Sequence, residues 1–449
     1  MGPRDIPGAP SEQLLVDGMQ VHAWHGLRYA VADSRFAPPR PATGRMMASR
    51  QHEVPIFPQL PGKLSAAMGH GRANTQSEDA FFLNIWAPPD GQGLPVVLFI
   101  HGGAWMTGGG AMAWYDGSQL AAQGLVVVNV NYRLGPFGHL GAPDAHALPI
   151  PAADLLLALQ WVLGNVHAFG GDPGRVTLMG QSAGGWYAHL LSVLPQTRGG
   201  IHRVALLSMG TRTPWLAERQ IEVTRRASLL VDGDLQGAPV EKLLEAGMSA
   251  LVREPPGLGH ASSAFLPVAS AGMPEKMLDP AWAARACHAE AVYIRCTADE
   301  SAAFFFNVPE QRNATQAQVD EALSQWLPAD LPPELQNNGA FCGASSGLSP
   351  YRQLVAASSW RQFQRFPAEY ARALKQLGKN VQFSSFETES MLEGLHSGHC
   401  FDLPFQFGNL DAWADAPMLA GFSVDRFDAI SRPLISDIAT FACARCPVS

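Results

Sequence analysis

The segment TLMGQSAGGWYAHLL, residues 177–191, decides the fold of this chain. It starts as an apolar run typical of the end of a β-strand, passes through Gly-Gln-Ser-Ala-Gly at 180–184, and continues into a run compatible with a helix. Glycine on both sides of Ser182 permits a tight turn in which larger side chains would collide. A Gly-x-Ser-x-Gly turn between a strand and a helix lifts its serine clear of the sheet. We therefore predict that Ser182 is a nucleophile held in such a turn.

Apolar runs rich in Val, Ile and Leu recur on both sides of this segment. They cover residues 94–103, 125–133, 175–182, 203–210, 291–301 and 381–390. Continuous rather than alternating apolar runs indicate strands that are covered on both faces. Helix-compatible segments, 152–169 and 183–194 among them, lie between the strands. This alternation predicts an α/β fold with a mostly parallel, doubly wound central sheet.

Three parts of the chain depart from this alternation. The first 90 residues are rich in proline, and DAFFLNIWAPP at 79–89 is predicted to be an antiparallel segment at the edge of the sheet. Two longer stretches, about 211–289 and about 303–378, are rich in helix-compatible sequence. We predict that both are helical insertions over one edge of the sheet that shape a substrate pocket. Residues 1–449 would then form a single catalytic domain.

Composition and charge exclude several classes of partner. Of the 449 residues, 47% are hydrophobic and 16% are charged, which is enough apolar sequence for a large core. The net charge of −8 argues against nucleic acid or an anionic membrane as a partner. The N-terminal sequence lacks the apolar core of a signal peptide, and we expect no membrane span and a cytoplasmic location. The oligomeric state is left open.

The six cysteines lie in the last third of the chain, at 287, 296, 342, 400, 443 and 446. So few cysteines, with no visible export signal, are expected to be free thiols. The pair at 443 and 446 has no second cysteine pair and no histidine partner, so we expect an ordinary helix end there and no metal site.

A serine nucleophile needs a base, an orienting acid and donors for the oxyanion. The sequence IHGGAWMTGG at 100–109 follows another predicted strand. A glycine-rich loop of this kind presents backbone N–H groups near the carboxyl end of the sheet. Its presence upstream of Ser182 is difficult to explain as a plain turn.

These motifs, in this order, resemble the type-B carboxylesterases of the α/β-hydrolase fold, the group that includes cholinesterases and bacterial esterases. The resemblance is dense from 26 to 210 and patchy afterwards. It is carried by GLRYAVADSRFAPPRP, SEDAFFLNIWAP, HGGAWMTGG, NYRLGPFGHLG, FGGDPGRVTLMGQSAGG, TADESAAFF and HCFDLPFQFG. The resemblance implies a serine hydrolase that acts on a small-molecule ester and needs no cofactor and no metal.

The resemblance also implies a catalytic triad. It places the nucleophile at Ser182 and the acid at Glu300 in TADES, although by chemistry alone Asp299 is an equally valid carboxylate. The base comes last in the chain order of this fold. Both His396 and His399 are candidates, and the family pattern H-x-x-[DE]-[LI]-P-[FY] aligns with His399.

The oxyanion donors implied by the family are the backbone N–H groups of Gly103, Ala104 and Ala183. Large apolar side chains also crowd these motifs. Core packing explains them as well as a pocket does, but Trp105 and Trp186, with Phe304, would form an aromatic wall near the serine. Such a wall would favour aryl or bulky hydrophobic esters.

Several further expectations follow from the resemblance. Glu78 and Arg133 are predicted to form a buried ion pair, as the matching motifs of the family do. The family's usual Glu before the nucleophile is Gln181 here, which removes one charge near the site. The predicted function is carboxylic-ester hydrolysis. An amidase or carbamate hydrolase with the same triad is the alternative, and a non-catalytic binding protein of this fold is a third.

Overall fold

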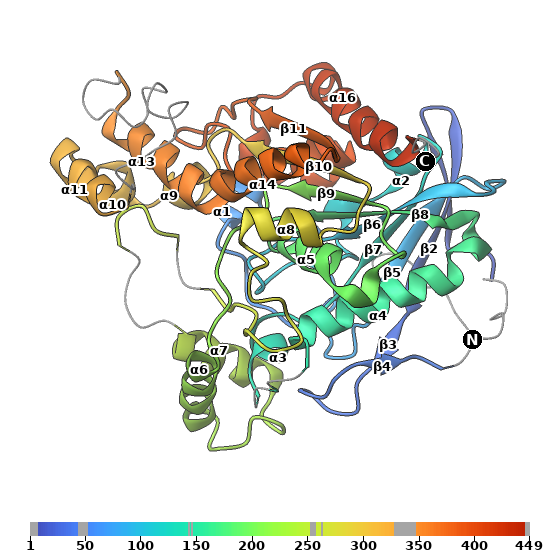
Figure 1. Ribbon diagram of the computed structural model, residues 1–449, viewed down its shortest axis with the longest axis horizontal. Helices are drawn as coiled ribbons and strands as arrows, with labels where there is room; N and C mark the ends of the chain where they lie inside the picture. Colours follow the sequence, from blue (N-terminus) through green and yellow to red (C-terminus); the bar gives the residue numbers. More distant parts are fainter. Residues whose placement is uncertain are drawn as a thin grey trace.

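The computed structural model describes residues 8–43, 53–141, 144, 147–251, 257–261, 264–326 and 347–444. Within them, nine strands form one sheet in the order β1-β2-β5-β7-β6-β8-β9-β10-β11 (Figure 1). In that order the bounds are Glu12–Val16, Met19–Arg28, Phe82–Ala87, Val126–Val130, Leu94–Ile100, Gly171–Gln181, Arg203–Leu207, Ala291–Thr297 and Asn380–Phe386. Every neighbouring pair from β7 to β11 is parallel. The predicted mostly parallel α/β sheet is confirmed.

One part of the strand prediction is wrong. The segment 79–89 contains β5, which is antiparallel as expected but lies between β2 and β7, inside the sheet. The hairpin of β1 and β2 pairs outside it, so β1 is the edge strand on that side. All residues of β5 after Phe82 are buried, which is typical of an interior strand covered on both faces.

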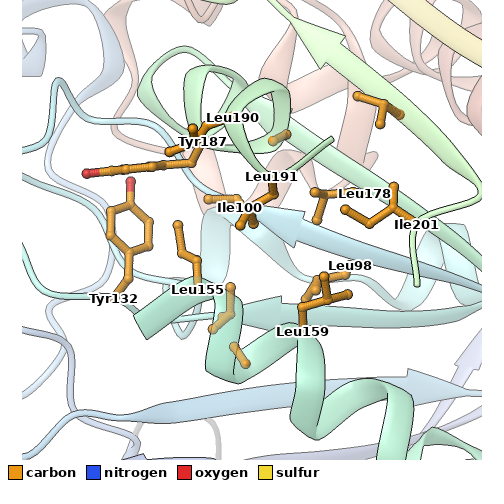
Figure 2. Close-up of a cluster of buried hydrophobic side chains, with 14 of the residues drawn as sticks. Leu98, Ile100, Tyr132, Leu155, Leu159, Leu178, Tyr187, Leu190, Leu191 and Ile201 are labelled. Carbon is orange, nitrogen blue, oxygen red and sulfur yellow. The ribbon is translucent and has the colours of Figure 1, made fainter. Parts of the chain in front are cut away.

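Helices cover both faces of the sheet, and the strands direct alternate side chains to each. One layer contains α4 (Ile150–Asn165), α5 (Ala183–Val193), α8 (Pro280–Ala286) and α14 (Arg365–Gln376). Figure 2 shows Leu155 and Leu159 of α4 facing Leu98 of β6 in this layer. The opposite layer contains α2 (Ser118–Ala121), α15 (Leu403–Phe407) and α16 (Val424–Cys443). There the intervening β6 residues Val97 and Phe99 are buried.

The helical segment Ile150–Phe169, which includes α4, is long and apolar enough to cross a membrane by length and composition alone. In the structure it packs on the sheet instead, where Leu155, Leu159 and Val162 are buried in the core.

Two further groups of helices lie outside the two layers (Figure 1). The first, between β9 and β10, consists of α6 (Ala217–Leu230) and α7 (Val240–Leu251), which pack on α3 (Gly135–His139). The second, between β10 and β11, contains α9 (Ala302–Phe305), α10 (Pro309–Arg312), α11 (Gln316–Trp326), α13 (Pro350–Ser359) and a π-helical turn at Trp360–Gln364.

The cysteines at 287, 296, 400 and 443 are free thiols, as expected. The other two, at 342 and 446, lie outside the described residues. Cys443 is the last residue of α16, so the helix end expected there is confirmed for that residue.

Candidate active site

Ser182 lies in a strained turn between β8 and α5. Its φ of 55° and ψ of −119° are rarely adopted by residues other than glycine. The flanking glycines permit this turn because no side chain fits there. A Cβ at Gly180 would lie 2.3 Å from the carbonyl oxygen of Gly184, and a Cβ at Gly184 would lie 2.0 Å from that of Ile100. The serine therefore stands at the carboxyl end of a central strand, at the start of a helix.

His399 connects Ser182 to a buried carboxylate. Its Nε2 lies 2.8 Å from Oγ of Ser182, and its Nδ1 is hydrogen-bonded to Oε2 of Glu300. The other oxygen of Glu300 accepts a hydrogen bond of 2.8 Å from the backbone N–H of Thr297 at the end of β10. The backbone N–H of His399 donates to the carbonyl oxygen of Glu300 at 3.1 Å. The structure thus joins the three side chains in one hydrogen-bonded line.

Asp299 and His396, the alternative candidates for the acid and the base, contact other residues. The carboxylate of Asp299 lies 3.7 Å from the guanidinium of Arg352 and accepts from a backbone N–H of the histidine loop. His396 is half-buried, and its Nδ1 lies 3.9 Å from a carboxylate oxygen of Glu389. Neither residue lines the cavity above Ser182. Of the two histidines, His399 contacts Ser182, and of the two carboxylates, Glu300 contacts His399.

The loop that carries His399 is anchored by a buried ion pair that sequence reasoning missed. Asp402 accepts two hydrogen bonds from Arg295, from Nε at 3.1 Å and from Nη2 at 2.8 Å. Both side chains are buried. An arginine in the middle of the otherwise apolar strand β10 was a usable signal, because a buried charge needs a partner.

The glycine-rich loop after β6 adopts unusual backbone angles beside Ser182. Gly103, Ala104 and Trp105 have φ values of 111°, 53° and 61°. A Cβ at Gly103 would lie 2.0 Å from the carbonyl oxygen of Thr107, so only glycine fits. Within the described part of the chain, the backbone N–H groups of Gly103 and Ala104 have no backbone acceptor.

The third implied donor belongs to Ala183. It is the first residue of α5, where a backbone N–H has no acceptor inside the helix. Gly103 and Ala104 line the same cavity as Ser182, whereas Ala183, the next residue in the chain after the serine, is buried. Backbone N–H groups that have no acceptor beside a serine can stabilise an oxyanion.

A cavity of about 440 Å³ opens above Ser182. That volume is typical of small-molecule sites. Its apolar walls come from the glycine-rich loop and from both helical insertions. They include Trp105, Leu244, Met248, Phe304 and Phe363.

Two of the three predicted pocket residues line this cavity, and the third does not. Trp105 and Phe304 are at its wall. Trp186 is fully buried and packs edge-to-face on Trp105, with ring centroids 6.1 Å apart. It lies one helical turn after Ser182, and its indole N–H donates to the carbonyl oxygen of Arg212 at 3.1 Å. Its placement as a pocket residue is wrong, because the helix turns the side chain toward the 210–212 segment.

The family model described as carboxylesterase matches residues 11–385 of the chain. The chain belongs to the carboxylesterase family. It is 33% identical to a probable N-octanoylanthranilate hydrolase of Rhodococcus erythropolis, over 90% of this chain and 85% of the relative. It is also 33% identical to the para-nitrobenzyl esterase of Bacillus subtilis, over 87% and 80%. A phenmedipham hydrolase of Pseudarthrobacter oxydans is 31% identical, over 92% and 83%.

Solved structures agree with the family assignment. The carboxylesterase of Geobacillus stearothermophilus superimposes with a TM-score of 0.77 at 28% identity, covering 96% of this chain and 88% of that one. A para-nitrobenzyl esterase gives 0.73 at 28% identity, covering 94% and 86%. The predicted α/β-hydrolase fold is confirmed, and the protein is a carboxylic-ester hydrolase.

The electrostatics of this carboxylesterase favour a charged imidazole at the site. Burial lowers the pKa of His399, but Cys400 and the Glu300 carboxylate raise it by more, so that it lies well above its ordinary value near 6.5. Phe304 and Phe363 pack on the imidazole ring, with centroids 5.4 and 4.7 Å away. The two phenyl rings also stack on each other, with centroids 5.8 Å apart, so they form one continuous apolar surface against the imidazole.

The predicted ion pair of the enzyme is wrong in its partners. Arg133 pairs with Asp154 of α4, with Nη2 2.6 Å from Oδ1 and Nε 3.0 Å from Oδ2. Glu78 pairs instead with Arg35 through two hydrogen bonds of 2.6 and 2.7 Å. Asp154 is fully buried and binds one edge of the Arg133 guanidinium with both carboxylate oxygens, and Nη1 of Arg133 donates to the carbonyl oxygen of Ala37, so the arginine is neutralised without Glu78.

Proposed function

We propose that the enzyme hydrolyses carboxylic esters through an acyl-enzyme on Ser182. The observation that carries this proposal is the hydrogen-bonded line from Oγ of Ser182 through His399 to Glu300. A serine hydroxyl is a weak nucleophile at neutral pH and needs a base in contact with it. The imidazole is in contact, and the carboxylate behind it holds the tautomer in which Nε2 can accept a proton.

In the proposed mechanism, Oγ of Ser182 attacks the ester carbonyl carbon while Nε2 of His399 takes its proton. The resulting imidazolium is stabilised by the Glu300 carboxylate, in accord with the raised pKa of His399. The tetrahedral intermediate breaks its bond to the leaving oxygen, which receives the proton from His399. Water then repeats the sequence on the acyl-enzyme and releases the acid and free Ser182.

The proposed oxyanion donors are the backbone N–H groups of Gly103, Ala104 and Ala183. They are supported by the positive φ angles of the first two residues and by the helix N-terminus at the third. Losing one such donor typically costs about 10²–10³ in kcat. The left-handed backbone at Ala104 is strained for a residue other than glycine. Donating to the oxyanion would be the function that this strained conformation serves.

Hydrophobic or aryl esters are the proposed substrates, because Trp105, Phe304 and Phe363 line the cavity beside the serine. Hydrolysis of an amide or carbamate by the same residues is the second candidate. It is favoured by one observation: a relative over most of the chain is named as a hydrolase of an N-octanoyl compound. A non-catalytic binding role is disfavoured, since the side chains of Ser182, His399 and Glu300 are all present and are joined by hydrogen bonds.

Covalent labelling tests the proposal. The protein should hydrolyse a short p-nitrophenyl ester, and a fluorophosphonate should label Ser182 alone, as found by peptide mapping. Ser182→Ala should abolish both activity and labelling while its circular dichroism spectrum stays that of the native protein, because alanine fits the turn. Label on another residue, or full activity in Ser182→Ala, would refute the assignment.

A further inference from the structure

The charged side chains around the cavity are of one sign. Among the described residues that line it, the permanently charged ones are Lys63, Arg72 and Arg212, and none is an aspartate or glutamate. The chain as a whole carries a net charge of −8, so the charge at the cavity wall is opposite in sign to the net charge of the chain. An apolar cavity with only cations at its wall attracts anions.

Arg212 is the cation whose position is fixed relative to the nucleophile. Its carbonyl oxygen accepts the indole N–H of Trp186, one helical turn after Ser182. The preceding residue, Thr211, donates from its backbone N–H at 3.0 Å and from its hydroxyl at 2.8 Å to the carbonyl oxygen of Gln362 in the π-helical turn. The backbone that carries the arginine is therefore clamped between the nucleophile helix and the second insertion.

The guanidinium of Arg212 has no partner among the described residues: no hydrogen bond or ion pair to a carboxylate, carbonyl or hydroxyl is formed. The fully buried arginines Arg133 and Arg295 each engage a carboxylate. Arg212 is partly buried, and burial lowers its pKa. A desolvated guanidinium without an acceptor is costly, and a bound anion would remove that cost.

The pKa values of two neighbouring groups respond to the positive charge of Arg212. Burial and the charge of Arg212 both lower the pKa of Lys63. Burial, Arg361 and Arg212, in that order, lower the pKa of His260. The charge of Arg212 is therefore close enough to both groups to act on their protonation.

We propose that Arg212 binds a carboxylate of the substrate, so that the natural substrates are hydrophobic esters that carry a free carboxylate. The inference rests on the proposed ester hydrolysis at Ser182 and names its substrate class. A guanidinium presents a planar fork that matches the two oxygens of a carboxylate. The aromatic wall of Trp105 and Phe304 would hold the apolar part of the same molecule.

Two matched substrate pairs test the proposal with the intact protein. In the first, p-nitrophenyl hydrogen suberate is compared with its methyl ester, so that the charge lies on the acyl half. In the second, 3-carboxyphenyl octanoate is compared with its methyl ester, so that the charge lies on the leaving group. The wild type should prefer the carboxylate in at least one pair by about tenfold or more in kcat/KM, and the pair concerned identifies the half of the substrate that Arg212 holds.

Variants of Arg212 then locate the source of the preference. Arg212→Met should lower the ratio of carboxylate to neutral kcat/KM by about 10- to 100-fold, as for loss of a charged hydrogen bond, with most of the change in KM. Arg212→Lys should restore part of the ratio, because it keeps the charge but not the fork. The control is Arg285→Met, which makes the same change in net charge at an exposed position on α8, outside the cavity.

The outcomes separate this inference from the proposed function. Turnover of neutral esters without preference for a carboxylate in either pair would overturn the role of Arg212 and leave Ser182 as the nucleophile. An unchanged ratio in Arg212→Met would do the same. If no ester is hydrolysed and Ser182 is not labelled, the proposed function itself fails.

Discussion

Arg295 and Asp402 form a fully buried ion pair that joins the middle of β10 to the loop after His399. Glu300 follows the same strand, so β10 holds the acid directly and the base through this pair. The relative position of the two residues therefore depends on one strand. Removing either charge would leave the other buried and unpaired.

Asp402→Asn should lower the free energy of unfolding by about 3–5 kcal/mol, because the charge of Arg295 loses its only described carboxylate partner. The measurement is urea unfolding followed by circular dichroism. Asp411→Asn, at an exposed position nearby, is the control and should stay within about 0.5 kcal/mol of the wild type. Equal stability of the two variants would contradict the anchoring role.

The structure has the ion pairs Arg133–Asp154 and Arg35–Glu78 in place of the predicted Glu78–Arg133 pair. The two should differ in how much they contribute to the free energy of unfolding. Asp154→Asn should cost about 3–5 kcal/mol, since Asp154 and Arg133 are both buried. Glu78→Gln should cost about 1 kcal/mol or less, because a third of the Glu78 side chain is exposed and Arg35 keeps its hydrogen bond to the carbonyl oxygen of Leu235. Thermal unfolding of the two variants side by side decides the matter, and the reverse order would be evidence against the observed pairing.

Histidine substitutions should separate the base from its neighbour. His399→Ala should lower kcat by about 10⁴–10⁶, the range for loss of a triad member. His396→Ala should keep most of the turnover, because His396 contacts Glu389 outside the cavity. Steady-state kinetics on one p-nitrophenyl ester is sufficient, and comparable losses in both variants would argue against His399 as the base.

The two adjacent carboxylates allow an equally direct comparison. Glu300→Gln should impair kcat far more than Asp299→Asn, since only Glu300 contacts the imidazole. Asp299→Asn should act mainly on stability through its contact with Arg352. The reverse order of kcat values would mean that the hydrogen-bonded line is not the catalytic one.

The pH dependence follows from the raised pKa of His399. The protonated imidazole cannot accept the serine proton, so kcat/KM should be low at acid pH and rise through a single ionisation. The midpoint should lie above 6.5, because Glu300 and Cys400 outweigh the effect of burial. Glu300→Gln should move the midpoint of its residual activity to lower pH. A wild-type midpoint below 6.5 would contradict this account.

The sequence correctly predicted those features that depend on residues close together in the chain. The Ser182 turn needs glycine at fixed neighbouring positions, and strand–helix alternation fixes a parallel sheet wherever both faces are covered. The position of β5 was predicted wrongly because strand order depends on which distant segment pairs outside it. Here that segment is the β1–β2 hairpin.

Site residues could be predicted where one short motif contains both the functional side chain and the neighbouring residues that position it. Ser182, Glu300 and His399 each lie in such a motif, and the structure brings them together. The direction of Trp186 was not predictable, because a helix places it against a segment from another part of the chain. The partners of Glu78 and Arg133 were missed for a similar reason: a buried charge binds the nearest opposite charge in space, and spacing along the sequence does not report that distance.

The edge position of β11 has a consequence for how His399 is held. β11 pairs with β10 alone and is largely exposed, whereas β8, which ends at Ser182, lies between β6 and β9 in the centre of the sheet. The chain reaches His399 only after leaving β11. Local opening of this edge strand would therefore free the segment that leads into the His399 loop while the nucleophile turn stays folded. The base would then be held mainly by the pair of Asp402 with Arg295 of β10, so that this pair limits how far an opened edge can displace His399.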